Sequence, residues 1–178
     1  VLFWLYGLCA FSRQLRNGCL LAAGLFFYAW GEPRYLLFLA LSVLINYGAG
    51  LLFLRPRSPG FKRGALALAV TLNVSLLLLG RYGGPMLNAL GVTSGQRLLP
   101  ELTAPALGIS FFTLQALSYL LDVSRGKPRA DKNIINVGLF ISLFPTVLAG
   151  PILRYRAFAG QLLVRNGSPE LFFRGCSR

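Results

Sequence analysis

The sequence contains no His, one Met and only five acidic residues among its 178 positions. Without His, no residue of this chain can supply an imidazole as a general base, a nucleophile or a metal ligand. Its three Cys residues, Cys9, Cys19 and Cys176, match no metal-binding spacing, and two of them lie in or beside apolar stretches as small buried side chains do. We therefore expect no metal site and no resident cofactor.

Charge is also scarce. Charged residues make up 13% of the chain, where about 25% is usual for a soluble domain. Hydrophobic residues make up 55%, and the mean hydropathy is +0.62. Such an apolar chain is not disordered, and a water-soluble domain of this length cannot bury so much apolar surface. The composition predicts that the lipid bilayer is the solvent and the first partner of this protein.

The charge that is present has mainly one sign. Lys and Arg number 18, which gives a net charge of +13 and an isoelectric point near 10.7. A charge of this size suggests nucleic-acid binding when it lies along one face of a polar protein. Here the basic residues lie in gaps between apolar runs, so we expect no nucleic-acid partner.

Uncharged apolar runs predict an all-α, polytopic membrane protein, because a helix needs about 20 residues to cross the hydrocarbon core. Pro33 and Pro105 suit the first turns of helices, and Asp131 and Asn133 are suited to cap the last segment. The chain begins without Met inside an apolar stretch and stops abruptly at Arg178, so we expect a fragment, a single incomplete membrane domain. The predicted spans are 1–12, 17–31, 35–54, 64–80, 102–121 and 133–153.

Basic residues gather in two gaps, 55–63 and 125–132, which two predicted spans separate. Because cytoplasmic loops are enriched in Lys and Arg, both gaps are predicted to face the cytoplasm. Counting backwards places Arg13 and Arg16 on the same side and residues 81–101 on the opposite side.

The last predicted span does not fit this alternation. A full crossing by 133–153 places the basic tail outside, and Pro145 and Gly150-Pro151 interrupt the same stretch. A broken or re-entrant segment satisfies both observations, whereas the alternative is a kinked span whose tail tolerates its charge. Residues 168–178 are predicted to form an amphipathic helix at the membrane surface.

Polar residues follow a helical repeat within the segment 102–121 and just beyond it. Gln115, Ser118, Tyr119 and Asp122 are spaced i, i+3, i+4, i+7, so they lie on one helical face. Polar groups inside a membrane span are costly, and this face is interpreted either as the wall of a cavity or as hydrogen-bonding glue between helices.

Two further sets of residues carry hypotheses. Asn46 and Asn73 are isolated within apolar segments, and we expect them to join helices by hydrogen bonds. Arg154-Tyr155-Arg156 follows an irregular stretch and is interpreted either as a site for an anion or lipid head group or as a plain interfacial anchor. No catalytic dyad or nucleotide-binding motif is present, so the residues alone leave transferase, transporter and scaffold open.

Three stretches resemble motifs of the membrane-bound O-acyltransferase family, in particular its alginate-acetylating branch. They are LFFYAWGEPR at 25–34, LGISFFTLQALSYLLD at 107–122 and FPTVLAGPILRY at 144–155. They occur in the family's order and extend over most of the chain. The sequence is therefore identified as a member of this family and, by extent, as an amino-terminal half.

The resemblance implies a helical bundle around a tunnel in the bacterial inner membrane. It implies an acyltransferase that takes an acetyl group from a cytoplasmic donor, such as acetyl-coenzyme A or a carrier-linked acetyl group. It further implies O-acetylation of an exported polysaccharide, together with a periplasmic acetyltransferase and export subunits. The positions that match the motifs and are expected to line or support the core are Ser110, Gln115, Tyr119, Asp122, Arg154 and Tyr155.

One departure from the family matters most. The family's catalytic His lies downstream of the third motif, and this chain has no His to which that role can be assigned. The resemblance therefore implies that the catalytic His lies beyond Arg178, and we expect the chain to be inactive alone. The alternatives are a membrane transporter, for which no internal inverted repeat is found, and a non-catalytic scaffold of a polysaccharide export complex.

Overall fold

The computed structural model describes residues 13–31, 33–54, 58–89, 108–126, 128, 130–143 and 154–163. Every regular element in these ranges is helical, which confirms the predicted all-α class. The helices are α2 (Arg13–Gly31), the 3₁₀ turn η2 (Pro33–Tyr35), α3 (Leu36–Leu54), α4 (Pro59–Ala89), α6 (Ile109–Ser124), α7 (Ile134–Ile141) and α9 (Tyr155–Leu163).

Two predictions lie outside the described residues. They are the span 1–12 and the surface helix 168–178, which includes Arg178. The expectation that the catalytic His lies beyond Arg178 concerns sequence outside this chain, so it stays a prediction as well.

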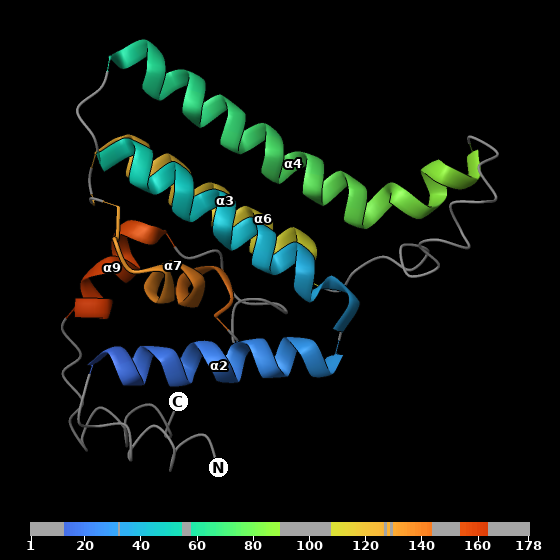
Figure 1. Ribbon diagram of the computed structural model, residues 1–178, viewed down its shortest axis with the longest axis horizontal. Helices are drawn as coiled ribbons and strands as arrows, with labels where there is room; N and C mark the ends of the chain where they lie inside the picture. The colour runs from blue at the N-terminus through green and yellow to red at the C-terminus, as the bar shows by residue number, and fades with distance from the viewer. Residues whose placement is uncertain are drawn as a thin grey trace.

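The helices stack as layers (Figure 1). Helices α3, α4 and α6 contact one another and form a three-helix unit, while α2 contacts α7 on the other side of α3. The short helices α7 and α9 pack against α6 and lie between this unit and α2. The core consequently forms where α3, α6, α7 and α9 meet, around Leu39, Phe112, Tyr119 and Phe140.

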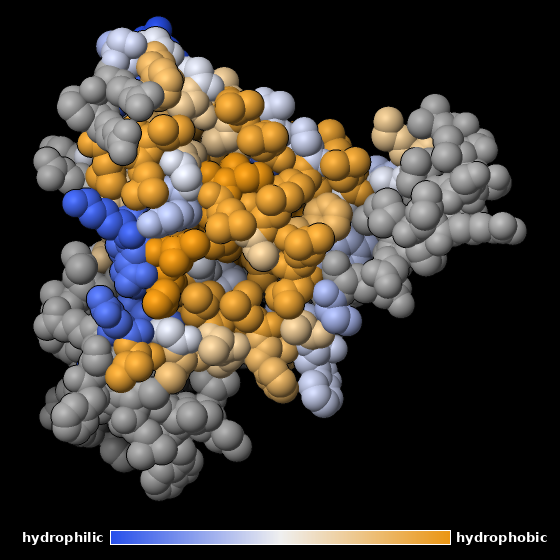
Figure 2. Space-filling model, viewed as in Figure 1, coloured by the Kyte–Doolittle hydropathy of each residue, from blue (hydrophilic) through white to orange (hydrophobic). Residues whose placement is uncertain are grey.

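Among the described residues, two helices are long and apolar enough to cross a membrane: Leu36–Leu54 in α3 and Pro59–Gly83 in α4. Only 28% and 22% of their most apolar windows are buried inside the protein, so most of this apolar surface faces outward. Figure 2 shows a broad apolar face over the middle of the molecule, with hydrophilic residues gathered along one edge. An exposed apolar surface of this extent is what a lipid-facing protein presents. The protein is an all-α membrane protein.

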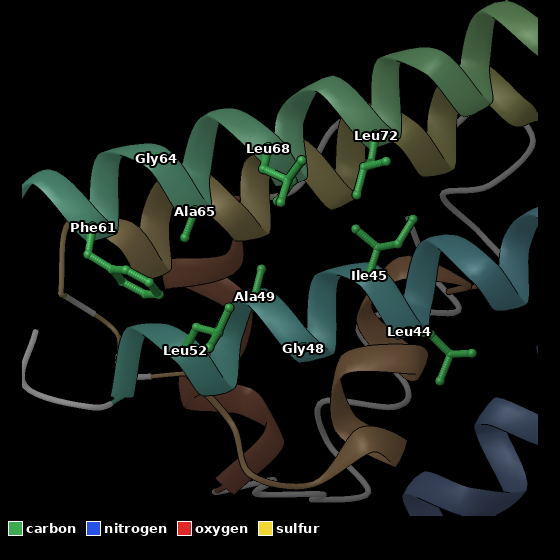
Figure 3. Close-up of a pocket in the computed structure, with 11 residues that line it drawn as sticks. Leu44, Ile45, Gly48, Ala49, Leu52, Phe61, Gly64, Ala65, Leu68 and Leu72 are labelled. Atoms are coloured by element: carbon green, nitrogen blue, oxygen red, sulfur yellow. The ribbon is translucent and has the colours of Figure 1, made fainter.

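An apolar groove of about 500 Å³ follows the junction of α3 and α4 on this outward side. Figure 3 shows the small residues on its two walls, Gly48 and Ala49 on α3 and Gly64 and Ala65 on α4. Phe61 stands at one end of the groove. The groove adds no polar chemistry, because all of its lining residues are apolar.

Two predicted boundaries need correction. Helix α4 begins at Pro59 and not at residue 64, because Lys62 and Arg63 lie in its first turns, where long basic side chains can reach water from an apolar helix. Helix α6 begins at Ile109 and not at residue 102, because its N-cap, Gly108, has a φ of 83°. That left-handed conformation interrupts a right-handed helix and favours Gly.

The segment 133–153 is not one continuous helix. Asn133 caps α7 by accepting a hydrogen bond from Ile135 N, as the sequence predicted, but α7 is only eight residues long. Eight helical residues rise about 12 Å, well short of the ~30 Å hydrocarbon core. The segment before α7 lies beside α3, where Tyr47 Oη donates a hydrogen bond to Lys132 O. The start of α9 lies near the end of α6, where Arg156 N donates a hydrogen bond to Asp122 Oδ2.

The segment before α7 and the start of α9 therefore lie at the same end of the bundle (Figure 1), as the two ends of a re-entrant segment must. The start of α4, the end of α6 and the segment before α7 lie at the same end (Figure 1), and they hold the described basic residues of both predicted cytoplasmic gaps, among them Lys62, Arg125 and Lys132. Which side of the membrane this end faces stays a prediction.

A buried polar cluster joins α3 to α4, as was predicted for Asn46 and Asn73. Ser42 Oγ and Asn46 Nδ2 both donate to Asn73 Oδ1, at 2.9 and 3.0 Å. Asn73 Nδ2 donates to Ala69 O at 2.8 Å, and Asn46 Nδ2 donates to Ser42 O at 2.7 Å. All three side chains are buried, and their hydrogen bonds confirm the interpretation as glue between helices.

Candidate functional site

The predicted polar face of α6 divides into buried and partly exposed members. Gln115 is 3% exposed and Tyr119 is fully buried, whereas Ser118 and Asp122 are half-buried. Ser110, from the same helix, is also half-buried. The helical spacing therefore brings Gln115 and Tyr119 together on the inward side of α6 and leaves the other members near its flank.

Gln115 and Tyr119 each hold a buried polar atom that no described residue satisfies. Within the part of the chain that the structure describes, Gln115 Nε2 and Tyr119 Oη are buried and have no hydrogen-bond partner. Leaving such a group unpaired costs about 1–3 kcal/mol. An unpaired buried donor is stabilised when an acceptor oxygen atom completes its hydrogen bond.

The surroundings of Tyr119 fix its ring. Its hydroxyl group lies against the backbone of Gly50 on α3. A Cβ atom on residue 50 would collide with the Tyr119 hydroxyl group. Tyr155 packs edge-on against Tyr119 with ring centroids 4.7 Å apart, and Phe140 packs against Tyr155 at 5.0 Å. Four helices, α3, α6, α7 and α9, thus position one phenol.

Asp122 has a structural task. Its Oδ2 accepts a hydrogen bond from Arg156 N at 3.1 Å, in the first turn of α9. A carboxylate at a helix N-terminus accepts a hydrogen bond from a free backbone N–H group, and its negative charge interacts favourably with the positive end of the helix dipole. Asp122 therefore anchors α9 to the end of α6, which is the packing role left open for the polar face.

The predicted group Arg154-Tyr155-Arg156 is divided by the structure. Tyr155 is 2% exposed and belongs to the aromatic core, while Arg154 and Arg156 are exposed. Burial and the nearby carboxylate of Asp131 raise the pKa of Tyr155, so its phenol stays neutral. Its ring serves packing, and only the two arginines remain available to an anion.

Sequence reasoning missed a second polar network. Asn17 Nδ2 on α2 donates to Asn136 Oδ1 at 2.8 Å, and Asn136 Nδ2 donates to Asp131 Oδ2 at 2.6 Å. Asp131 Oδ1 accepts from Asn133 N at 2.9 Å. The network ties α2 to the start of α7 across a separation of 119 residues, which no local sequence pattern reveals.

A cavity of about 720 Å³ opens at the end of the bundle that carries the basic residues. It lies between the end of α3, the start of α4, the end of α6 and the segment before α7. Its polar side chains are Tyr47, Lys62 and Lys132. Ala130 lines this cavity and also lies near Gly50, against which the Tyr119 hydroxyl packs. The two basic gaps in the sequence predicted only an orientation in the membrane, and no cavity was expected from them.

Among the described residues, no three His, Cys, Asp or Glu side chains come together as a metal site needs. The chemistry available here is hydrogen bonding from Gln115 and Tyr119 inside the bundle, and positive charge at its basic end.

Comparison with known proteins gives relatives over nearly the whole chain. It is 33% identical to probable alginate O-acetylase AlgI of Pseudomonas aeruginosa over 94% of this chain and 33% of that protein. It is also 33% identical to the protein of the same name from Azotobacter vinelandii, over 93% of this chain and 34% of the relative. A peptidoglycan O-acetyltransferase of Helicobacter pylori is 29% identical over 83% of this chain and 32% of its own length.

The chain thus spans about a third of the length of the curated relatives it matches. No family model matches the sequence, and no solved structure matches it.

Proposed function

Because this chain is similar over nearly its whole length to probable alginate O-acetylases, we propose that it belongs to the membrane-bound O-acyltransferase family and forms part of a membrane O-acetylase. The enzyme moves an acetyl group from a cytoplasmic donor toward hydroxyl groups of an exported polysaccharide, alginate or a similar polymer. The observation that carries the proposal is 33% identity over 94% of the chain to proteins named for that activity. The relative named for peptidoglycan O-acetylation supports a carbohydrate acceptor in general.

In this proposal the described bundle supplies binding and positioning. Gln115 Nε2 and Tyr119 Oη donate hydrogen bonds to the acyl carbonyl oxygen, where negative charge develops as the acceptor hydroxyl attacks. Transfer forms a new ester bond to the acceptor and breaks the bond between the acyl carbon and its carrier, while the hydroxyl proton passes to a base. The chain has no His, so the imidazole base proposed for this step belongs to residues beyond Arg178.

The donor is proposed to be anionic and to reach the enzyme from the cytoplasm, as a coenzyme A thioester or a carrier-linked acetyl group. The end of the bundle that carries Lys62, Arg125 and Lys132 supports this, because it attracts negative charge. The proposed setting is the bacterial inner membrane, crossed several times, with a periplasmic acetyltransferase and export subunits as partners.

Deleting the gene in its source organism tests this function. We expect the exported polysaccharide to lose its O-acetyl groups, measured by proton nuclear magnetic resonance, while the amount of exported polymer is unchanged. Re-expression of the intact protein restores acetylation. Loss of polymer export itself, with the remaining polymer fully acetylated, contradicts the proposal and favours a transporter or an assembly scaffold.

A further inference from the structure

The cavity at the basic end has the size of a ligand site. Its volume of about 720 Å³ falls within the ~300–1,000 Å³ that is typical of pockets for small molecules and cofactors. Its walls come from four separate parts of the chain, represented by Tyr47, Lys62, Val123 and Lys132. A pocket assembled from so many elements is fixed by the packing of the bundle and not by one loop.

The described residues that line this cavity include two lysines and no acidic residue. Within the described ranges, neither Lys62 nor Lys132 forms an ion pair. Asp122 and Asp131 do not line the cavity. Asp122 accepts from Arg156 N, and Asp131 accepts from Asn133 N and Asn136 Nδ2. The described lining of the cavity therefore carries a net positive charge.

Hydrogen bonds fix the backbone at both lysines. Tyr47 Oη donates to Lys132 O at 3.0 Å, which fixes the backbone that carries Lys132 beside α3. Lys62 lies in the first turns of α4, and its backbone N–H donates to Ser58 O at 3.2 Å. The N-terminal end of a helix adds about half a positive charge, so the start of α4 reinforces the field of the Lys62 side chain.

From these observations we propose that this cavity binds a phosphate or diphosphate group through Lys62 and Lys132. A phosphate offers several acceptor oxygens to lysine ammonium groups, and lysine binds it as a point charge. In the reaction described above, this group belongs to the phosphorylated carrier of the acyl donor, and that assignment rests on the proposed function. An anionic lipid head group carries the same chemistry, so the test separates the two sources.

The probe is inorganic pyrophosphate, added to the intact purified protein in nanodiscs of phosphatidylcholine and measured by isothermal titration calorimetry. We expect saturable binding, weakened about tenfold by Lys62→Ala and by Lys132→Ala, which corresponds to about 1.4 kcal/mol for each lost ammonium group. Arg63→Ala is the matched control: it removes the same charge one residue from Lys62, outside the cavity, and leaves pyrophosphate affinity unchanged.

A second arm replaces phosphatidylcholine by phosphatidylglycerol. If the ligand is a soluble phosphate, the pyrophosphate affinity is the same in both nanodiscs. If it is a lipid head group, phosphatidylglycerol competes with pyrophosphate, and native mass spectrometry finds bound phosphatidylglycerol that is lost in the variants. Either result supports a phosphate site. Equal binding by wild type and the double lysine variant, or no binding of either probe, overturns it.

Folding and activity are controlled separately. Lys62→Arg and Lys132→Arg keep the charge, so we expect them to retain most of the affinity. A size-exclusion profile equal to that of the wild type shows that the alanine variants are folded. Because binding is measured without acyl transfer, failure of this inference leaves the proposed acetylase untouched, and failure of the acetylase leaves the phosphate site standing.

Discussion

Two buried polar clusters of the bundle differ in whether their polar atoms are paired. Between α3 and α4, Asn46 and Asn73 form hydrogen bonds with each other, with Ser42 and with backbone carbonyls. On α6, Gln115 Nε2 and Tyr119 Oη are equally inaccessible and have no partner within the described residues. Both clusters lie within apolar helices, and they differ in whether their buried polar atoms are hydrogen-bonded to described residues.

The difference separates stability from function. A polar cluster whose donors and acceptors are all hydrogen-bonded within the protein holds helices in register in an apolar environment. It needs no ligand to complete its hydrogen bonds. An unsatisfied buried donor lowers stability unless a ligand completes it. The α3–α4 cluster is therefore interpreted as structural, and the α6 pair as part of a site. Substitutions in each cluster should have opposite consequences.

The largest effect on folding is expected from Asn73→Ala. This change removes the acceptor shared by Ser42 and Asn46 and leaves both donors buried, which lowers the free energy of unfolding by about 2 kcal/mol. Thermal unfolding of the intact protein in detergent measures it. Ser75→Ala on the exposed side of α4 is the control and should leave the midpoint unchanged. An unchanged midpoint for Asn73→Ala shows that the cluster does not hold the helices.

Gly50→Ala should have the next largest effect. The new methyl group meets the Tyr119 hydroxyl, so either the packed Tyr119 ring or the two helices must shift, at a cost of about 1–3 kcal/mol. Adding Tyr119→Phe removes the colliding oxygen atom and should recover at least half of the loss. A double-mutant cycle in the same unfolding assay measures the coupling. Additive losses indicate that Gly50 and Tyr119 do not touch.

Asp122→Leu should act locally on α9. Loss of the carboxylate that accepts from Arg156 N removes a helix cap that contributes about 1 kcal/mol. Hydrogen exchange of residues 155–163 should speed up about fivefold, since exchange follows the local opening free energy. Asp122→Asn keeps an acceptor oxygen and should show a smaller change. Equal exchange in wild type and Asp122→Leu contradicts the capping role.

The smallest effect on stability is expected from Tyr119→Phe and Gln115→Leu. Each removes a polar atom that has no partner, so the free energy of unfolding should change by less than about 1 kcal/mol, or rise. The same thermal unfolding assay applies. A loss as large as that of Asn73→Ala means that these atoms are paired in the folded protein, and the contrast between the clusters then disappears.

Sequence alone predicted the helical class and the helix at 35–54, because charges or turn residues bracket that apolar run on both sides. It shortened α4, because charges at Lys62 and Arg63 look like a boundary when only composition is counted. It also placed the start of α6 too early, since the left-handed Gly108 gives no signal that distinguishes it from other glycines.

For the site, the helical repeat brought Gln115 and Tyr119 onto one face in advance of the structure. It did not separate them from Asp122, whose partner lies 34 residues away on α9. The pair of Asn17 and Asn136 was invisible for the same reason. Spacing along one helix follows from its geometry, whereas contacts between helices depend on packing that single-segment patterns do not encode.

The most direct test of the central claim is the acetyl content of the exported polymer when the intact protein carries Tyr119→Phe or Gln115→Leu. Membrane abundance is matched to wild type, and Thr113→Val is the control, because the Thr113 hydroxyl group already donates to Ile109 O within its own helix. The account predicts that acetylation falls about 100-fold or more in both variants, the scale of losing an oxyanion donor, and is unchanged in the control. Full acetylation in both variants would contradict it.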